Sequence, residues 1–214
     1  MSKGTETRST ILDEALAAAS RVGFESLSIG DLARRVGMSK SGLFAHFASK
    51  EALQLQVLEA AVERFVERVV VPALEAPRGE PRIRAFFDRW LAWDDDPETG
   101  GCIFMQLANE LDARPGPVRD RLVASQEDWI GSLATAARIA VDEGHFRRDV
   151  DVHQFAYEMY SIALVHHHFK RLLRDPDAEA RARRSFETLL AACRPGGAAS
   201  ASRSAGPAPR GSGA

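Results

Sequence analysis

Apolar residues recur at helical spacing along almost the whole chain, and this periodicity limits the possible folds more than any other feature. In the segment 5–22, for example, Ile11, Leu12, Ala15, Leu16 and Ala19 fall on one side of a helix. No segment alternates apolar and polar residues between turn signals in the manner of a β-strand. The sequence therefore predicts an all-α fold.

The size and composition are those of a globular protein. The 214 residues are 45% hydrophobic, which allows a sizeable core in one domain or in a small domain joined to a larger one. The chain has no apolar run of about 18 residues, as a membrane helix requires, and its first ten residues lack the apolar stretch of a secretion signal. We therefore expect a cytoplasmic protein that does not enter a membrane.

The two cysteines, Cys102 and Cys193, are too few and too far apart for a disulfide framework or a zinc site. We expect both to be buried thiols. Redox sensing is the alternative interpretation of either thiol.

Capping residues mark the helix boundaries in the first third of the chain. Serine hydroxyls accept hydrogen bonds from backbone N–H groups of the first helical turn, and glycines often terminate helices. These signals predict helices over residues 5–22, 28–37, 40–46 and 50–72, with Ser28, Ser39 and Ser49 as caps of the last three.

Beyond this point the predicted helices become longer and are separated by proline- and glycine-containing breaks. They cover about residues 81–94, 102–113, 117–143, 152–174 and 177–193. Residues 194–214 consist of 18 Gly, Ala, Ser or Pro residues and three arginines, so we expect a disordered tail. The chain thus divides into a head (1–50), a body (51–193) and the tail; the head carries a net charge of +2 and the remainder −4.

The two short helices of the head have the pattern of a helix-turn-helix motif. Ala33 provides a small residue where the helices approach each other, and Gly37 serves the turn. In this motif the first residues of the second helix, here Lys40, Ser41 and Gly42, enter the major groove of DNA. The apolar residues expected to point inward are Leu32, Val36, Met38, Leu43 and Phe47.

Other residues near this motif are also suited to contact DNA. Phe44 and His46 are expected on the exposed side of the second motif helix, and Lys50 begins the next helix, where free N–H groups and the helix dipole favour a phosphate. An ordinary helical hairpin with solvated lysines and serines is the alternative explanation of the spacing alone.

The segment "LSIGDLARRVGMSKSGLFAHFASKEAL" closely resembles the DNA-binding signature of the TetR family of transcriptional regulators. The resemblance covers about residues 5–55, and the long helices that follow resemble the ligand-binding and dimerisation body of that family. It implies a phosphate-binding cap at Ser28, base contacts or close approach at Lys40, Ser41 and Gly42, and backbone contacts at Phe44, His46 and Lys50. Ser39, as the cap of the recognition helix, completes the set of expected DNA-binding residues.

One position departs from the family pattern. Phe44 stands where the family usually has tyrosine, so the hydroxyl that would bond a phosphate is absent and only van der Waals packing remains. We expect Lys40 to be the main base-reading residue, because it can donate to O6 or N7 of guanine.

The body is rich in aromatic residues, which are more often core than ligand contacts. The resemblance implies a mostly apolar effector cavity among the middle helices. On that basis Trp90, Phe104, Met105 and Trp129 are the expected cavity wall.

Three consecutive histidines, His166–His168, are the other conspicuous feature of the body. Successive residues of a helix point about 100° apart, so these three cannot converge on one metal ion without ligands from elsewhere. One histidine is expected in the core, one towards a dimer partner and one in solvent. Glu110 and Asp112 are expected on a solvated face. The sequence predicts no metal, no cofactor and no catalytic residue.

The last two predicted helices have more apolar surface than a single bundle needs. A helix that is apolar on two sides is buried on two sides, so we expect a four-helix interface with a second copy of the chain. The residues expected at this interface are Tyr160, Ala163, His167, Phe186 and Leu190.

Taken together, the residues and the resemblance predict a homodimeric transcriptional regulator. Its partners are expected to be double-stranded DNA with a pseudo-palindromic operator and a small apolar effector that releases the protein, as expected of a repressor. The alternative is a helical-bundle enzyme or ligand carrier that uses the histidine-rich helix. The effector, the operator sequence and the target genes are not determined by the sequence.

Overall fold

The computed structural model describes residues 3–96 and 101–196, and all regular structure within them is helical. This confirms the predicted all-α fold. None of the helices in these ranges is both long and apolar enough to cross a bilayer. Residues 197–214, most of the predicted tail, lie outside the described residues.

The head consists of α1 (Lys3–Val22), α2 (Ile29–Arg35) and α3 (Lys40–His46). Ser28, Ser39 and Ser49 all act as the predicted caps, since each hydroxyl accepts a backbone N–H from the first turn of the helix that follows. The predicted inward residues Leu32, Leu43 and Phe47 are buried in the core. Val36 and Met38 are only half-buried, because both lie at the turn itself rather than inside a helix.

A single helical rod leads from the head into the body. It comprises α4 (Lys50–Phe65), a π-helical turn (Val66–Val70) and α5 (Val71–Leu74). The wider turn ends two residues before Pro72, and the N–H of Val71 reaches back five residues to the carbonyl of Val66. Proline cannot donate an N–H and crowds the preceding turn, so a π-helical turn lets the rod pass through Pro72 without a break.

The body is completed by α6 (Glu80–Asp95), α7 (Ile103–Leu111), α8 (Pro117–Asp142), α9 (Val152–Arg171) and α10 (Ala178–Cys193). Two of these helices are shorter than predicted: α7 ends before the segment 112–113, and α9 ends before 172–174. In both cases the next residues form a turn, which local periodicity does not distinguish from another helical turn.

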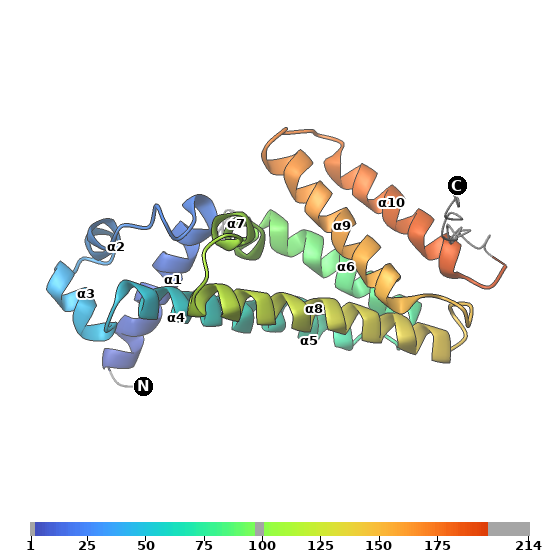
Figure 1. Ribbon diagram of the computed structural model, residues 1–214, viewed down its shortest axis with the longest axis horizontal. Helices are drawn as coiled ribbons and strands as arrows, with labels where there is room; N and C mark the ends of the chain where they lie inside the picture. The colour runs from blue at the N-terminus through green and yellow to red at the C-terminus, as the bar shows by residue number, and fades with distance from the viewer. Residues whose placement is uncertain (1–2, 97–100, 197–214) are drawn as a thin grey trace, which may run out of the picture.

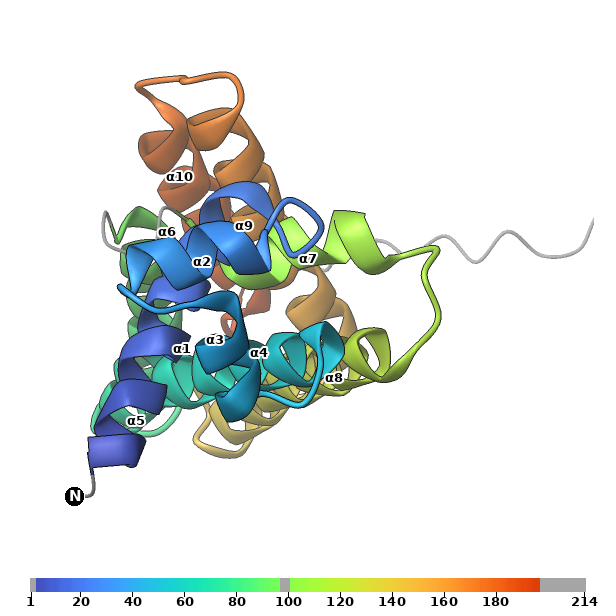
Figure 2. The same ribbon diagram turned by 90° about the vertical axis from the view of Figure 1, so that its left-hand side faces the viewer.

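The elements form an elongated molecule with the head at one end (Figure 1). The rod and α8 run side by side along its length, and α9 and α10 form an antiparallel pair on one side of the other end. Figure 2 views the molecule from the head end, with α2 and α3 in front of the body. Head and body also touch directly, because α1 packs against both α4 and α7.

The expected tail begins later than residue 194. The guanidinium of Arg194 binds the carboxylate of Glu80, with Nε 2.8 Å from Oε2. This contact fixes the end of α10 against the start of α6. Arg194 therefore belongs to the folded body, which corrects the predicted boundary.

Candidate nucleic-acid interface and ligand cavity

The turn between α2 and α3 has the geometry that a helix-turn-helix motif requires. Gly37 adopts a φ of 68°, which a residue with a Cβ rarely takes. The backbone N–H of Met38 donates to the carbonyl of Ala33 at 2.8 Å and closes the turn. Ala33 is buried where the two helices meet, as predicted.

The start of α3 presents polar groups to solvent. Ser39 Oγ accepts the N–H of Gly42 at 3.0 Å and lies 3.0 Å from Ser41 Oγ. Lys40 and Ser41 are exposed, and residue Phe44 keeps 45% of its surface accessible. His46 is only half-buried rather than fully exposed, because its ring lies beside Phe47.

The structure brings Lys40 and Ser28 together, although Ser28 caps α2 and Lys40 begins α3. Both line a shallow depression with Asp31 and Arg34. The Lys40 side chain crosses Gly30, where a Cβ would lie 2.7 Å from Lys40 Cε. Gly30 therefore leaves room for the lysine, a role that the sequence reasoning missed because the glycine lies inside a predicted helix.

Lys50 occupies a different part of the head. It begins α4, and its Nζ lies 3.4 Å from the carbonyl oxygen of Glu25 in the loop between α1 and α2. The Glu25 carboxylate in turn binds Arg114 of the body at 2.7 Å. The hydrogen bond from Arg114 and its charge lower the pKa of Glu25.

Glu110 does not lie on a freely solvated face, contrary to the expectation. Its Oε2 accepts the backbone N–H of Phe24 at 2.8 Å, directly after α1 ends. Asp112 is exposed, as expected. Glu110 thus joins α7 of the body to the head.

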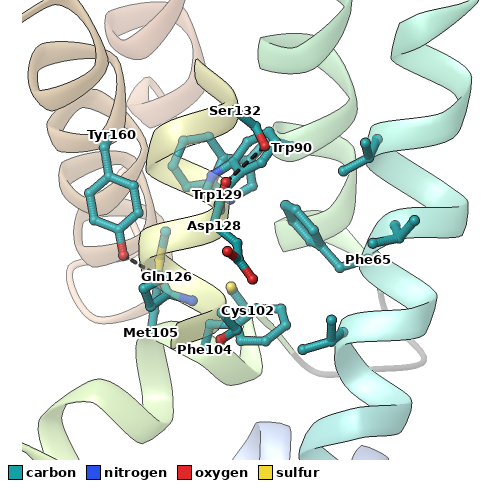
Figure 3. Close-up of a pocket in the computed structure, with 14 residues that line it drawn as sticks. Phe65, Trp90, Cys102, Phe104, Met105, Gln126, Asp128, Trp129, Ser132 and Tyr160 are labelled. Carbon is teal, nitrogen blue, oxygen red and sulfur yellow. Dashed lines mark hydrogen bonds between the residues drawn. The ribbon is translucent and has the colours of Figure 1, made fainter. Parts of the chain in front are cut away.

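The four residues expected to form a ligand-binding wall, Trp90, Phe104, Met105 and Trp129, all line one cavity of about 160 Å³ (Figure 3). They come from α6, α7 and α8. Phe65 of α4 adds a ring that the sequence reasoning missed, and it packs edge-on against Trp129 with ring centroids 4.9 Å apart. Residues that line the cavity are therefore contributed by the same rod that begins at Lys50.

The polar groups in this cavity are mostly uncharged. Burial raises the pKa of Tyr160 to about 12 and that of the Cys102 thiol to about 11, so both are protonated at neutral pH. The Tyr160 hydroxyl donates to Gln126 Oε1 at 2.6 Å. Asp128 is the one charged residue among the described lining residues, and it is exposed.

Both cysteines are buried, as predicted. Burial also raises the pKa of the Cys193 thiol to about 11. Because the thiolate is the reactive form, this environment disfavours redox chemistry at either residue.

Four of the five predicted dimer-interface residues face the interior of their own chain. Ala163, Phe186 and Leu190 are buried, and the ring of Phe186 stacks on Phe87 with centroids 4.0 Å apart. Tyr160 faces the cavity.

A different stripe of α9 is exposed and apolar, and it consists of Tyr157, Leu164, Val165 and, just after the helix, Leu172.

The three histidines point in three directions, as predicted from helix geometry. His166 is buried, His168 is exposed and His167 is half-buried. His167 Nδ1 lies 2.6 Å from Asp94 Oδ1 of α6, so this ring binds a carboxylate of its own chain.

Comparisons with known proteins agree with a helix-turn-helix head followed by a helical body. Residues 11–57 match the family model described as "Bacterial regulatory proteins, tetR family", and residues 79–186 match "Tetracyclin repressor-like, C-terminal domain". No curated protein sequence matched the chain.

Solved structures share the whole fold. A TetR transcriptional regulator from Chloroflexus aurantiacus J-10-FL is 26% identical, with 90% of this chain and 96% of that chain covered and a TM-score of 0.80. A TetR-family regulator from Cytophaga hutchinsonii is 20% identical, with 91% and 98% covered and a TM-score of 0.78. AibR, solved in complex with isovaleryl coenzyme A and operator DNA, is 21% identical, with 86% and 98% covered and a TM-score of 0.69.

The family models cover the head and most of the body, and the family consists of regulators rather than enzymes. The alternative of a helical-bundle enzyme is therefore not supported. The chain belongs to the TetR family of DNA-binding transcriptional regulators.

Proposed function

We propose that this regulator is a homodimeric repressor that acts in the cytoplasm. It binds a pseudo-palindromic operator through the start of α3 and leaves it when a small, mostly apolar molecule occupies the cavity.

The observation that carries the proposal is the continuity of the rod between the two sites. Lys50 at its first turn lies in the head, while Val62, Phe65 and Val66 line the cavity about four turns later. A ligand that displaces the Phe65 ring therefore acts on the helix to which the head is attached. Glu110 supplies a second connection, because α7 both lines the cavity and binds the backbone after α1.

The composition of the cavity supports an apolar effector. Aromatic and aliphatic side chains dominate its wall, and the Tyr160 hydroxyl and Cys102 thiol are neutral at physiological pH. Such a site binds through buried apolar area, while Gln126 and Tyr160 offer a few hydrogen-bonding groups for orientation.

The head supports DNA binding in the major groove. Ser39, Lys40 and Ser41 are exposed at the start of α3, and Gly42 has no side chain to hinder close approach of a base or phosphate. Ser28, Phe44, His46 and Lys50 are proposed to contact the DNA backbone. In a dimer the two α3 helices must lie about 34–36 Å apart to enter successive major grooves.

The exposed apolar stripe of α9 supports dimerisation. Tyr157, Leu164 and Val165 recur at helical spacing on a face that residues 3–96 and 101–196 leave uncovered. Pairing of this face with its copy in a second chain buries it. The proposed interface thus keeps α9, one of the two predicted helices, but uses its outer side.

Fluorescence anisotropy with DNA fragments that flank the protein's own coding region tests the first half of the proposal. Sequence-specific binding over random DNA at fixed salt is expected. Equal affinity for both would contradict operator recognition.

Ligand titration tests the second half. Apolar metabolites are screened by thermal shift, and the tightest binder is titrated with and without operator. We expect operator affinity to fall roughly 5- to 150-fold at saturation, and operator DNA to weaken ligand binding by the same factor. Identical ligand affinity in the two titrations would show that the cavity and the head are uncoupled.

A further inference from the structure

A buried cluster of ionisable groups lies between α6 and α9, separate from the DNA-binding surface. Asp94 and His166 are each only 2% exposed. Within the described residues Asp94 Oδ2 and both ring nitrogens of His166 have no hydrogen-bond partner. Buried polar groups of this kind are costly and call for an explanation.

The unpartnered atoms of these two residues face each other. His166 Nε2 lies 4.0 Å from Asp94 Oδ2, which is too long for a hydrogen bond. A Zn²⁺ ion holds nitrogen and carboxylate oxygen ligands at about 2.0–2.2 Å, so two atoms that share one ion lie about 3–4 Å apart. The observed separation is close to that range.

The Asp94 carboxylate is already oriented for such a role. Its Oδ1 accepts the backbone N–H of Cys102 at 3.2 Å and lies 2.6 Å from His167 Nδ1. These two contacts leave Oδ2 as the atom available to a ligand, and they have the form of the outer-shell contacts that orient metal ligands.

Asp95 provides a third ligand. One ligand atom from each of Asp94, Asp95 and His166 can be chosen such that all lie within 4.8 Å of one another. Asp95 now pairs with Lys170, and both side chains are about one third exposed. A partly solvated pair of this kind is weak, so Lys170 can turn into solvent and free the Asp95 carboxylate. Because Asp95 reaches the surface, it also marks a route of entry.

We propose that Asp94, Asp95 and His166 form a binding site for one divalent transition-metal cation. A set of one imidazole and two carboxylates suits Zn²⁺, Co²⁺ or Fe²⁺, whereas Mg²⁺ and Ca²⁺ prefer oxygen alone. Of the three consecutive histidines of α9 only His166 is a ligand in this proposal. The other two ligands, Asp94 and Asp95, come from α6.

The surroundings limit the affinity. The guanidinium of Arg171 donates to the backbone carbonyl of Asp94, and its positive charge repels a metal ion bound nearby. We therefore expect weaker binding than at a closed structural site with four protein ligands. A bound cation joins α6 to α9, the helix that carries the proposed dimer stripe.

The test uses full-length protein with any affinity tag removed and with metal stripped by a chelator. Zn²⁺ is titrated by calorimetry, and Co²⁺ is titrated by visible absorption, which reports its coordination. We expect one equivalent of either ion, and excess Mg²⁺ should not displace it. Absence of binding by both methods would overturn the proposal.

Three variants assign the ligands. His166→Gln and Asp95→Asn should each weaken Co²⁺ binding at least 10-fold and alter its spectrum. His168→Gln, an exposed neighbour in the same helix, is the matched control and should leave both unchanged. If His166→Gln does not fold, as judged by circular dichroism, Co²⁺ binding by the half-buried Asp95→Asn variant decides whether these residues hold the ion. Unchanged binding in Asp95→Asn, or equal loss in His168→Gln, would place the ion elsewhere and refute the assignment.

Discussion

Glu110 Oε2 accepts a hydrogen bond from the backbone N–H of Phe24 at 2.8 Å, so a side chain of the body holds the backbone two residues after the end of α1. The approach is close because Gly23 lies between them: a Cβ on this residue would be 2.2 Å from the same oxygen. Gly23 also has a φ of 77°, which favours glycine. Head and cavity are therefore connected by a specific contact as well as by the rod.

Replacement of Glu110 tests this connection. Glu110→Ala leaves the Phe24 N–H without its acceptor and should lower the free energy of unfolding by about 1–2 kcal/mol. Glu110→Gln keeps an oxygen acceptor and should cost less than half as much. Urea unfolding gives the energies, and hydrogen exchange of the Phe24 amide should be faster in the alanine variant. Equal exchange in both variants would mean that the bond does not persist in solution.

Lys40 and Lys50 should differ in their effect on DNA binding. Lys40→Ala should cost about 1–3 kcal/mol mainly on the specific site, because its loss removes a base contact. Lys50→Ala should weaken binding to specific and random DNA alike and reduce the slope of log K against log salt by about one.

Anisotropy titrations at several salt concentrations measure both effects. Arg78→Ala is the control, because Arg78 is an exposed arginine of the body that pairs with Glu143. If the two lysine variants lose discrimination equally, the base reader has been misassigned.

Trp129 should be the most sensitive position of the cavity wall. Its ring packs edge-on against Phe65, Phe86 and Trp90, so Trp129→Ala should lower the free energy of unfolding by about 3–5 kcal/mol. Trp129→Phe should cost much less, since Nε1 has no hydrogen-bond partner in the described residues and only volume is lost. Denaturant unfolding at one fixed protein concentration compares the two, and equal losses would contradict this packing argument.

The outer stripe of α9 should control the oligomeric state. Leu164→Glu places a charge on the proposed interface and should convert the dimer to a monomer of half the mass in light scattering after gel filtration. Val71→Glu is the control, because Val71 is a similarly exposed apolar residue on α5. A dimer that survives Leu164→Glu would place the interface on another surface.

Glu80 should make stability depend on pH. Hydrogen bonds from Arg194 and Arg84 outweigh burial and lower its pKa below the usual 4.5. A lowered folded-state pKa contributes stability above the unfolded-state value, and this contribution is lost as the pH falls below about 4.5. Glu80→Gln should therefore reduce stability at pH 7 by about 1 kcal/mol, and the difference from the parent should shrink below pH 4.5.

Arg194 provides a further check of the same contact. Truncation after residue 193 should resemble Glu80→Gln, whereas truncation after residue 196 should leave the melting temperature unchanged. A melting temperature unaffected by either truncation would show that Arg194 contributes nothing to the fold.

The sequence by itself determined the helices and the features that depend on neighbours along the chain. Ser28, Ser39 and Ser49 cap helices where predicted, because a cap involves only a hydroxyl and the next three residues. Gly37 forms the expected turn for the same reason. The aromatic residues of the cavity could be identified because the resemblance indicated which helices surround it.

Only the tertiary structure decided which partner each side of a helix meets. The periodicity of α9 shows that the helix is apolar on two sides, but it does not tell the side facing its own core from the side facing solvent. Ala163 therefore lies in the core and Leu164 on the surface, contrary to the predicted interface.

Contacts between distant segments could not be predicted from the sequence either. Glu110 and Phe24 are 86 positions apart, and Asp94 and His167 are 73 apart, so no local pattern relates them. Their pairing follows from how the helices pack, which depends on the shape of the whole core rather than on any one segment.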